Sequence, residues 1–315
     1  MPVTTGRRAG IDVGGTKCLG VVWYEGRIVL EVRRDTPNGA DDIIDTLVSI
    51  VRELGEVDSV GVGVPGLVTR QGVLRAAPNL VNIADFAVGP ILRDILHCEV
   101  AVENDATCAA VAEWSAGVAQ GVDDVVVVTL GTGIGGGLVS GGRLVRGANG
   151  FAGEIGHMVV DPSGPKCVCG QRGCWERYAS GNGLAYLGAL AAERGQARMV
   201  QTLAGGITGI RGEHIREAAI LGDEEAVAIV DEFARWVAIG LSNLTNLLDP
   251  SMIVIGGGLA GSGDLFLQPI QRWFGELLYS PELRPHPKLV LAKFAEQAGA
   301  IGAALLPEFA HISDI

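Results

Sequence analysis

Residues 151–157 read Phe-Ala-Gly-Glu-Ile-Gly-His, and residues 167–176 read Cys-Val-Cys-Gly-Gln-Arg-Gly-Cys-Trp-Glu. Cys167, Cys169 and Cys174 lie within eight residues, and His157 lies ten positions before the first of them. Three cysteines and one histidine can complete a tetrahedral shell around Zn²⁺, whereas a disulfide between cysteines one residue apart would be strained. The segment therefore predicts a structural zinc site, with disulfide-bonded or simply buried cysteines as the alternative.

Zinc in this segment would fix the polar side chains around it. Glu154 and Glu176 flank the four candidate ligands. Because a metal-bound loop holds its neighbours in one orientation, we expect Glu154, His157 and Glu176 to face a polar molecule that binds nearby.

The composition is that of a globular protein of 315 residues, with 48% hydrophobic and 19% charged residues, long enough for two domains. A formal net charge of −12 and the lack of Lys/Arg runs argue against nucleic-acid binding. The first ten residues contain no apolar stretch typical of a signal peptide, and no window approaches twenty apolar residues. We therefore expect a cytoplasmic protein without a membrane span, in which Cys18, Cys98 and Cys108 are free core thiols.

Two strand–turn–strand patterns, one near the start of each half, contain glycine-rich turns. Apolar strands at 9–13, 18–24 and 28–32 surround the first turn, Gly14-Gly15-Thr16-Lys17. A strand at 125–130 leads into the second, Gly131-Thr132-Gly133, and more glycines and strands follow. A P-loop or a dinucleotide-binding fold requires a helix where these turns are followed by a strand, so we reject both motifs. The repetition suggests internal duplication.

Both turns can cradle phosphate through successive backbone N–H groups. In the first turn Thr16 adds a hydroxyl, and Asp12 at the strand end can hold Mg²⁺ or its water ligands. An ordinary hairpin turn could use the same residues, so plain turn formation is the alternative.

Asn104 and Asp105 follow a short strand at 99–102 and precede an alanine-rich helix at 106–118. N-capping of that helix would by itself explain both residues. Alternatively, a carboxylate at the C-terminal end of a strand can accept the proton of a substrate hydroxyl. The position favours neither interpretation.

Three further stretches contain glycine or asparagine at a turn, and for the first of them two interpretations are open. The glycines at 256–258 follow a strand at 252–255 and either let a flat ring lie against the backbone or form a tight turn. Gly66 ends a strand at 59–64, and Asn79 follows Pro78 in a loop, where asparagine is a common turn residue.

In their order along the chain, these segments resemble the ROK family of sugar kinases and repressors. The segments are Asp12-Val-Gly-Gly-Thr-Lys, Glu103-Asn-Asp, Leu130-Gly-Thr-Gly-Ile-Gly-Gly-Gly, Glu154-Ile-Gly-His, the run 167–176 and Ile255-Gly-Gly-Gly. Within the family, the chain is most similar to the ATP-dependent bacterial glucokinases of actinobacterial type. Each glycine turn alone is weakly specific, but the combination with the cysteine segment is very specific and covers essentially the whole chain.

The resemblance implies an α/β, actin-like (ribonuclease H-like), duplicated two-domain fold with a mixed five-stranded sheet in each domain and a cleft between them. Residues 1–118 and 299–315 would form the small domain, and residues 119–298 the large domain with the zinc segment. Like other members of the family, the protein would form a homo-oligomer, either a dimer or a tetramer.

The resemblance also implies ATP-dependent phosphorylation of the 6-hydroxyl of glucose, giving glucose 6-phosphate and ADP, with Asp105 as the base. The sugar ligands would be Gly66, Asn79, Asn104, Asp105, Glu154, His157 and Glu176. Asp12 would position Mg²⁺, Gly14, Gly15, Thr16, Lys17, Gly131, Thr132 and Gly133 would hold the phosphates, and Gly256, Gly257 and Gly258 would border the adenosine. The zinc ligands would be His157, Cys167, Cys169 and Cys174, with His157 serving the metal through one nitrogen and the sugar through the other.

Alternative functions remain within the same family. The polar residues could bind another hexose or N-acetylhexosamine, such as fructose or N-acetylmannosamine. Polyphosphate could replace ATP, although the second glycine-rich turn and the acidic surface favour a nucleotide. A sugar-sensing repressor is less favoured, because Asp12 follows a tail too short for an N-terminal helix-turn-helix domain.

Overall fold

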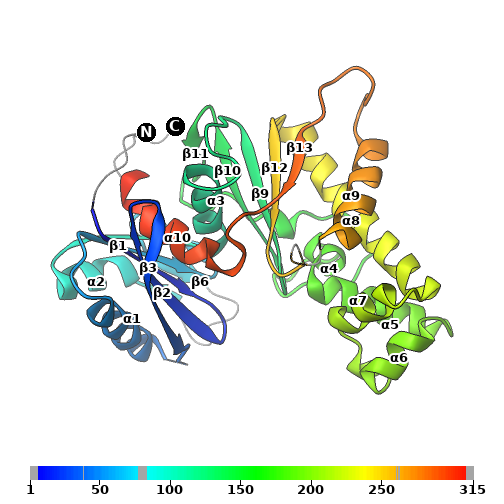
Figure 1. Ribbon diagram of the computed structural model, residues 1–315, viewed down its shortest axis with the longest axis horizontal. Coiled ribbons are helices and arrows are strands. Elements are labelled where there is room, and N and C mark those ends of the chain that lie inside the picture. Colours follow the sequence, from blue (N-terminus) through cyan, green and yellow to red (C-terminus); the bar gives the residue numbers. More distant parts are fainter. Residues whose placement is uncertain (1–5, 38, 77–83, 260, 262, 310–315) are drawn as a thin grey trace. The chain divides into compact units, whose positions relative to one another are not determined.

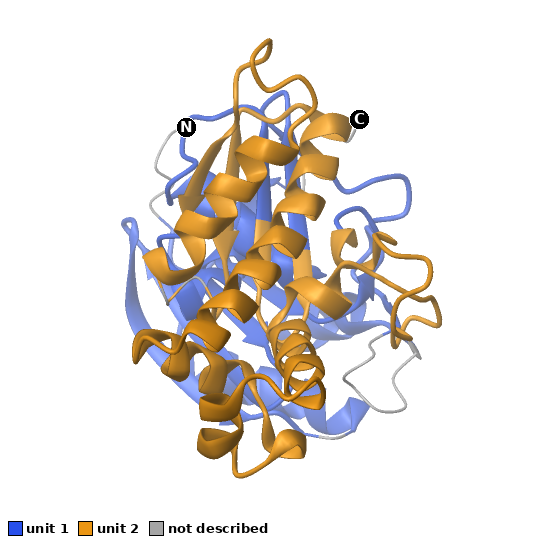
Figure 2. Cartoon of the chain, turned by 90° about the vertical axis from the view of Figure 1, so that its right-hand side faces the viewer, with its two compact units in different colours: residues 1–127, 136–153, 292–315 blue, residues 128–135, 154–291 orange. Residues whose placement is uncertain are grey.

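The computed structural model describes residues 6–37, 39–76, 84–259, 261 and 263–309. The chain divides into two compact units, coloured separately in Figure 2. Unit 1 comprises Met1–Val127, Gly136–Gly153 and Ala292–Ile315, and unit 2 comprises Val128–Gly135 and Glu154–Leu291. The domain boundaries expected from the sequence stay a prediction.

A five-stranded sheet with the order β3-β2-β1-β4-β8 forms the centre of unit 1 (Figure 1). Its strands are β1 (Arg8–Val13), β2 (Lys17–Tyr24), β3 (Arg27–Asp35), β4 (Ser59–Val64) and β8 (Glu99–Asn104). The pairs β1–β2 and β2–β3 are antiparallel, and the pairs β1–β4 and β4–β8 are parallel. The predicted opening hairpins are therefore confirmed.

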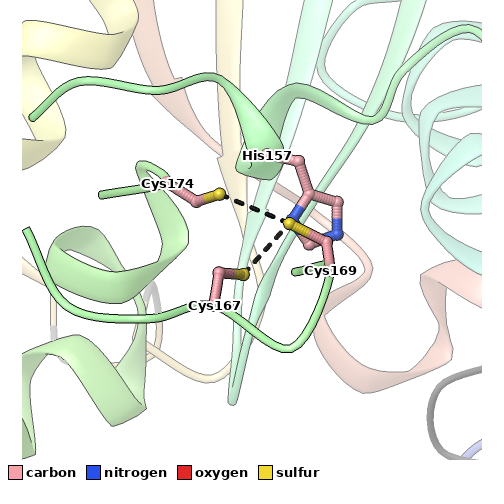
Figure 3. Close-up of side chains that lie close together, drawn as sticks. All are labelled: His157, Cys167, Cys169 and Cys174. Atoms are coloured by element: carbon pink, nitrogen blue, oxygen red, sulfur yellow. Dashed lines mark hydrogen bonds between the residues drawn. The ribbon is translucent and has the colours of Figure 1, made fainter. Parts of the chain in front are cut away.

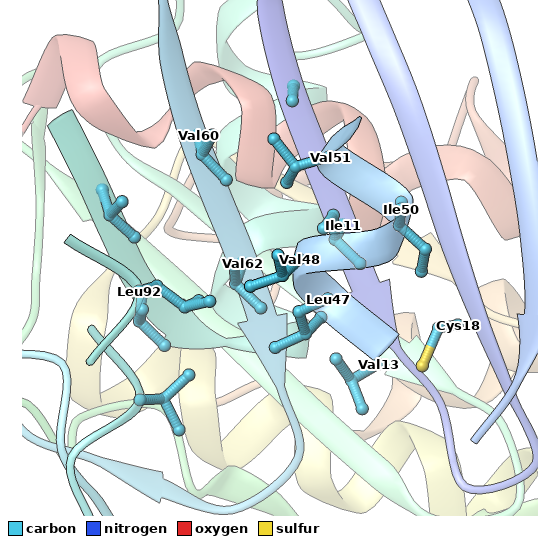
Figure 4. Close-up of a cluster of buried hydrophobic side chains, with 14 of the residues drawn as sticks. Ile11, Val13, Cys18, Leu47, Val48, Ile50, Val51, Val60, Val62 and Leu92 are labelled. Atoms are coloured by element: carbon cyan, nitrogen blue, oxygen red, sulfur yellow. The ribbon is translucent and has the colours of Figure 1, made fainter. Parts of the chain in front are cut away.

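The side chains of β1 alternate between the two faces of this sheet, as in any strand. Ala9, Ile11 and Val13 pack into a core cluster with α1 (Ala40–Leu54) and α2 (Val88–Leu96), shown in part in Figure 4. Gly10 and Asp12, between them, face α10 (Ala298–Leu305). A Cβ at Gly10 would lie 1.9 Å from the carbonyl oxygen of Ala300, so glycine is required for the helix to approach this closely. The alternation thus places Asp12 on the α10 side of the sheet.

A second five-stranded sheet has the order β11-β10-β9-β12-β13. Its strands are β9 (Val125–Leu130), β10 (Ile134–Ser140), β11 (Arg143–Leu144), β12 (Met252–Gly256) and β13 (Lys288–Leu291). In both sheets the order in space is third, second, first, fourth and fifth strand along the chain. Both contain an antiparallel β-hairpin and a parallel pair. This repeated topology supports internal duplication, and each glycine-rich turn is followed by a strand, in agreement with rejection of the P-loop and dinucleotide-binding motifs.

The helices of unit 2 surround the 25-residue helix α8 (Glu224–Leu248). Asp223 caps its N-terminus by accepting a hydrogen bond from the N–H of Ala226 at 2.8 Å. The helix ends at Asp249, which adopts a left-handed conformation before Pro250. The neighbouring helices are α4 (Glu176–Ala179), α5 (Gly181–Glu193), α6 (Arg198–Ala204), α7 (Gly212–Ile220) and α9 (Asp264–Leu277).

Several elements differ from the sequence expectations. Helix α3 (Asp105–Ser115) ends before 118, and β13 ends at Leu291, whereas the sequence suggests a strand over residues 288–294. The sequence did not predict α2, α6 or the small sheet β5-β6-β7, whose strands are Leu67–Val68, Leu74–Ala76 and Ala84–Phe86. These elements are too short to show a clear hydrophobic period, and the Gly89-Pro90 pair inside α2 is typical of a turn.

All six cysteines are free, and Cys98 is only partly buried, in contrast to the expected core position. Among the residues that the structure describes, no helix is long and apolar enough to cross a lipid bilayer.

Candidate active site

The cysteine segment gathers four potential metal ligands in unit 2 (Figure 3). The ligand atoms of His157, Cys167, Cys169 and Cys174 all lie within 4.8 Å of one another. The Sγ atoms of Cys169 and Cys174 are 3.5 Å apart, far beyond the roughly 2.05 Å of a disulfide. Tetrahedral Zn²⁺ with bonds of about 2.3 Å to sulfur needs ligand atoms roughly 3.7 Å apart. The set therefore fits zinc and excludes the disulfide alternative.

Contacts within the chain also shape this loop. The backbone of Cys167 donates to Gln171 at 2.8 Å, closing the turn that contains Cys169. The hydroxyl of Tyr178 donates to Asp161 at 2.6 Å, and its ring stacks on Trp236 with a centroid separation of 4.0 Å. Burial and this hydrogen bond raise the pKa of Tyr178, so the phenol stays protonated as the donor. These contacts hold the loop against α4 and α8, in addition to the proposed zinc site.

His157 lies between the cysteines and Glu154. Its Nδ1 is 3.6 Å from Sγ of Cys167, and its Nε2 is 3.9 Å from a carboxylate oxygen of Glu154. Burial raises the pKa of Glu154, the Glu176 carboxylate raises it further, and His157 lowers it. The two ring nitrogens therefore face different partners, as expected for one nitrogen on the metal and the other toward a ligand.

Glu176 connects the cysteine segment to the second glycine-rich turn. Its Oε2 accepts a hydrogen bond from the backbone N–H of Ile134 at 2.9 Å. A Cβ at Gly133 would lie 2.3 Å from the same oxygen, so a larger residue there would displace the Glu176 carboxylate. The other end of the turn is held by α5: the N–H of Gly181, the first residue of this helix, donates a hydrogen bond of 2.7 Å to the carbonyl of Gly131. The sequence did not predict this contact, because no motif joins a glutamate to a backbone 42 residues away.

The glycine turn after β12 lies beside the end of β9. Gly257 has a φ of 83°, and a Cβ there would lie 2.5 Å from the carbonyl oxygen of Leu130. That oxygen also accepts from the N–H of Leu259 at 3.1 Å. The turn therefore packs directly against the strand that leads into Gly131, which brings two of the predicted nucleotide-binding turns together in unit 2.

In unit 1 the side chain of Asp12 lies close to that of Asp105. Asp12 pairs in register with Gly63 of β4, and a Cβ at Gly63 would lie 3.5 Å from the Cα of Asp105. Burial raises the pKa of Asp12, the charge of Asp105 raises it further, and together they bring it to about 7. Gly299 at the start of α10 leaves room for the Asp12 carboxylate, which a Cβ there would meet at 2.6 Å. Two neighbouring carboxylates are a favourable site for a divalent cation such as Mg²⁺.

The first glycine-rich turn is a short hairpin loop that begins two residues after Asp12. The N–H of Gly14 donates to the carbonyl of Lys17 at 2.9 Å, and the Thr36 hydroxyl donates to the Gly14 carbonyl at 2.7 Å. Gly15, Thr16 and Lys17 are exposed. The structure thus fixes the base of the turn and leaves its tip open to solvent.

Asn104 is the N-cap of α3, as the structural interpretation expected. Its Oδ1 accepts from the N–H groups of Ala106 at 2.9 Å and Thr107 at 3.1 Å, and its Nδ2 donates to the carbonyl of Gly66 at 3.2 Å. Asp105 is the first residue of the helix, and its Oδ1 accepts from the N–H of Ala106 at 2.8 Å. Capping explains Asn104, whereas it does not explain the placement of Asp105 beside Asp12. The predicted sugar ligand Asn79 lies outside the described residues.

Glu103 is a buried carboxylate whose role the sequence did not reveal. It is 2% exposed, its Oε2 is 2.6 Å from Nε of Arg146, and its Oε1 accepts from the N–H of Asn104 at 3.0 Å. The ion pair holds the end of β8, where Asn104 and Asp105 begin the helix. A charged residue inside an apolar strand was the available signal, but Arg146 belongs to no motif.

A duplicated α/β fold with two glycine-rich hairpin turns, adjoining carboxylates and a Cys₃His segment defines an actin-like sugar kinase. The comparison with protein families agrees, because the ROK family matches residues 8–308. The chain belongs to the ROK family.

Known relatives include several sugar kinases. A glucokinase of Streptomyces coelicolor is 39% identical over 310 residues, covering 95% of this chain and 96% of that protein. An N-acetyl-D-glucosamine kinase of Pectobacterium atrosepticum is 36% identical and covers 97% of this chain and 99% of its own length. Among solved structures, a ROK family glucokinase from Streptomyces griseus in complex with glucose and AMPPNP is 40% identical, with a TM-score of 0.85. The match covers 96% of this chain and 99% of that one.

Proposed function

We propose that this protein is an ATP-dependent glucokinase, which transfers the γ-phosphoryl group of ATP to the 6-hydroxyl of glucose. One observation carries the proposal: Asp105 lies beside Asp12 at the strand ends of unit 1, in a chain 40% identical to a glucokinase solved with glucose and AMPPNP. That pair matches the needs of phosphoryl transfer to an alcohol, namely a proton acceptor and a place for the metal that accompanies the nucleotide.

Asp105 acts on the hydroxyl nucleophile. A sugar hydroxyl is a weak nucleophile at neutral pH, and a carboxylate cannot deprotonate it fully. Asp105 instead orients the oxygen and accepts its proton while the phosphoryl group arrives. One of its oxygens accepts a hydrogen bond from the N–H of Ala106, which orients the carboxylate.

The remaining residues bind and align the two substrates. The turns at 14–17 and 131–133 hold phosphate through backbone N–H groups, and Gly256–Gly258 border the adenosine. Asp12 would hold Mg²⁺, which when bound neutralises phosphate charge. Asn104, Gly66, Asn79, Glu154, His157 and Glu176 recognise the sugar hydroxyls. A sugar that lacks one of these hydroxyls would leave an acceptor unpaired when the bound ring covers it, at a cost of about 1–3 kcal/mol.

Zinc would serve this site as a structural ion. His157, Cys167, Cys169 and Cys174 would hold it, and the bound ion would fix Glu154 and Glu176 on either side of it. Glu176 in turn holds the second glycine turn, so the same segment orders groups for both the sugar and the phosphates.

The test is a coupled ADP-release assay over glucose, fructose, mannose, N-acetylglucosamine and N-acetylmannosamine. We expect kcat/KM to be highest for glucose. Higher turnover of an N-acetylhexosamine would favour the alternative function, which the similarity to an N-acetyl-D-glucosamine kinase makes the second candidate. Polyphosphate in place of ATP, in the same assay, should give no product.

We further propose that the enzyme acts in the cytoplasm, where ATP is available, and assembles as a homodimer or homotetramer. Its net charge of −12 disfavours DNA as a partner, in contrast to a sugar-sensing repressor. Size-exclusion chromatography with light scattering tests the assembly, and a gel-shift assay with genomic fragments tests DNA binding.

A further inference from the structure

A cavity in unit 1 is lined by none of the residues predicted to bind sugar, phosphate or metal. It has a volume of about 430 Å³, within the range of about 300–1,000 Å³ that small-molecule sites occupy. It lies against β8, the edge strand of the first sheet, and is completed by the β5–β6 turn, the β10–β11 hairpin and the 3₁₀ turn Leu306–Phe309. The cavity is therefore separate from the residues of the proposed active site.

The charge at this cavity is opposite to that of the whole chain. Five charged residues line it, and four of them are arginines: Arg70, Arg93, Arg143 and Arg146. The fifth is Glu103, so the lining carries a net charge of +3, whereas the chain carries −12. A concave surface with one sign of charge concentrates counter-ions, so the cavity attracts anions.

Arg70 donates to the main-chain carbonyl of Gly147, and of the other three arginines Arg93 and Arg143 can present positive charge to a ligand. Arg146 is neutralised by its ion pair with Glu103. Arg93, by contrast, donates to the main-chain carbonyls of Val100 at 3.2 Å and Gln71 at 3.1 Å, which orient the guanidinium without cancelling its charge. Arg143 is exposed, and within the described part of the chain its side chain makes no hydrogen bond or ion pair.

The floor of the cavity is aromatic and apolar. The rings of Trp114 and Phe309 lie 5.1 Å apart with an interplanar angle of 37°, and both side chains are largely buried. Val100, Val102 and Leu306 extend the apolar surface. Such a floor favours a flat apolar group that can pack against the two rings.

We infer that this cavity binds a small organic anion that joins a flat apolar body to an acidic head group. The body packs against Trp114 and Phe309, and the head group accepts charge-assisted hydrogen bonds from Arg93 and Arg143. The inference does not depend on the proposed kinase activity, because no residue of the proposed active site lines the cavity.

The test uses anilinonaphthalene sulfonate, an aromatic sulfonate, as the probe in isothermal titration calorimetry. Saturating glucose and AMPPNP in the cell keep the probe from the proposed active site. We expect saturable binding of one probe per chain. The uncharged N-phenylnaphthylamine, which has the same aromatic body without the sulfonate, should bind at least about tenfold more weakly because it forms no charge-assisted hydrogen bonds.

Arginine variants locate the probe. Arg143→Gln should weaken sulfonate binding several-fold, and Arg93→Gln combined with Arg143→Gln should weaken it at least about tenfold. The matched control is Arg216→Gln, which removes an exposed positive charge from α7 in unit 2 and should change nothing. The Arg143 side chain makes no hydrogen bond or ion pair with the described residues, so its single variant keeps the test valid if the Arg93 variant fails to fold. Equal affinity for both probes, or unchanged affinity in Arg143→Gln, would overturn the inference.

Discussion

The two glycine-rich turns have the same place in two sheets of the same topology, yet different parts of the chain hold them. The first turn, at 14–17, is closed by its own backbone and by Thr36, and Asp12 lies just before it. The second turn, at 131–133, follows a strand that contains no carboxylate, and Glu176 of the cysteine segment contacts the turn. The duplication thus supplies two similar turns with different neighbours: the first follows the strand that carries Asp12, beside Asp105 in unit 1, and the second is in contact with the cysteine segment of unit 2.

The largest effect is expected from the carboxylates of unit 1. Asp105→Asn should lower kcat by about 10²–10⁴-fold, because the amide cannot accept the hydroxyl proton, while the dissociation constant for glucose changes little. Steady-state kinetics and calorimetric glucose titration measure the two quantities. Asp94→Asn, an exposed aspartate on α2, is the matched control. A variant at position 105 with near-normal kcat would show that another group is the base.

A smaller effect is expected from the metal ligands of unit 2. We expect about one zinc per chain, and Cys169→Ser should raise KM for both glucose and ATP by about 10–100-fold, since Glu176 orders both sites. Kinetics and metal analysis of purified protein check this. Cys98→Ser, outside the ligand set, should be silent. Fully active protein without zinc, or a change confined to glucose, would break the proposed link between the cysteine segment and the second turn.

An alanine substitution should affect the stability of the protein differently in the two turns. Gly133→Ala places a Cβ 2.3 Å from Glu176 Oε2 and should lower the free energy of unfolding by about 1–3 kcal/mol. Gly15→Ala meets no atom within 4 Å, so it should leave stability within about 0.5 kcal/mol of the original. Urea denaturation of both ligand-free variants measures the difference. Equal stabilities would mean that Glu176 does not constrain the second turn.

An effect of similar size to that of Gly133→Ala is expected from the pH dependence that Asp12 confers on stability. Its pKa is about 7 in the folded protein against 3.8 for an unperturbed aspartate, so the folded state retains a proton that the unfolded chain has lost between these values. Stability should therefore fall as pH rises through this window. In metal-free buffer at pH 8, Asp12→Asn should be more stable than the original by about 1–3 kcal/mol, allowing for partial exposure.

Urea denaturation at pH 5 and pH 8 tests this dependence. The advantage of Asp12→Asn should shrink at pH 5, where the original aspartate is protonated in the fold. An equal advantage at both values would assign the effect to packing and not to charge.

The sequence predicted most of what local pattern determines. The hairpins, the long helix α8 and the Cys₃His set follow from strand alternation, helical period and ligand spacing, and each is present. The missing parts depend on contacts between distant segments. The Glu103–Arg146 pair, the bond from Glu176 to Ile134 and the place of Gly299 against Asp12 all join residues more than 40 positions apart. A local sequence pattern cannot predict contacts between residues so far apart in the chain.

The sequence pattern could not decide the roles of Asn104 and Asp105. Capping and catalysis were equally good explanations from their positions, and only the fold separates them: Asn104 makes the cap, while Asp105 lies beside Asp12. The assignment of Asp105 as the base remains a proposal that rests on this geometry.

The most direct test of the account is a crystal structure of the protein with glucose and AMPPNP. The account predicts the 6-hydroxyl of glucose within hydrogen-bonding distance of the Asp105 carboxylate, with Glu154, His157 and Glu176 on the ring hydroxyls and zinc on the three cysteines. Glucose bound away from Asp105 would contradict it.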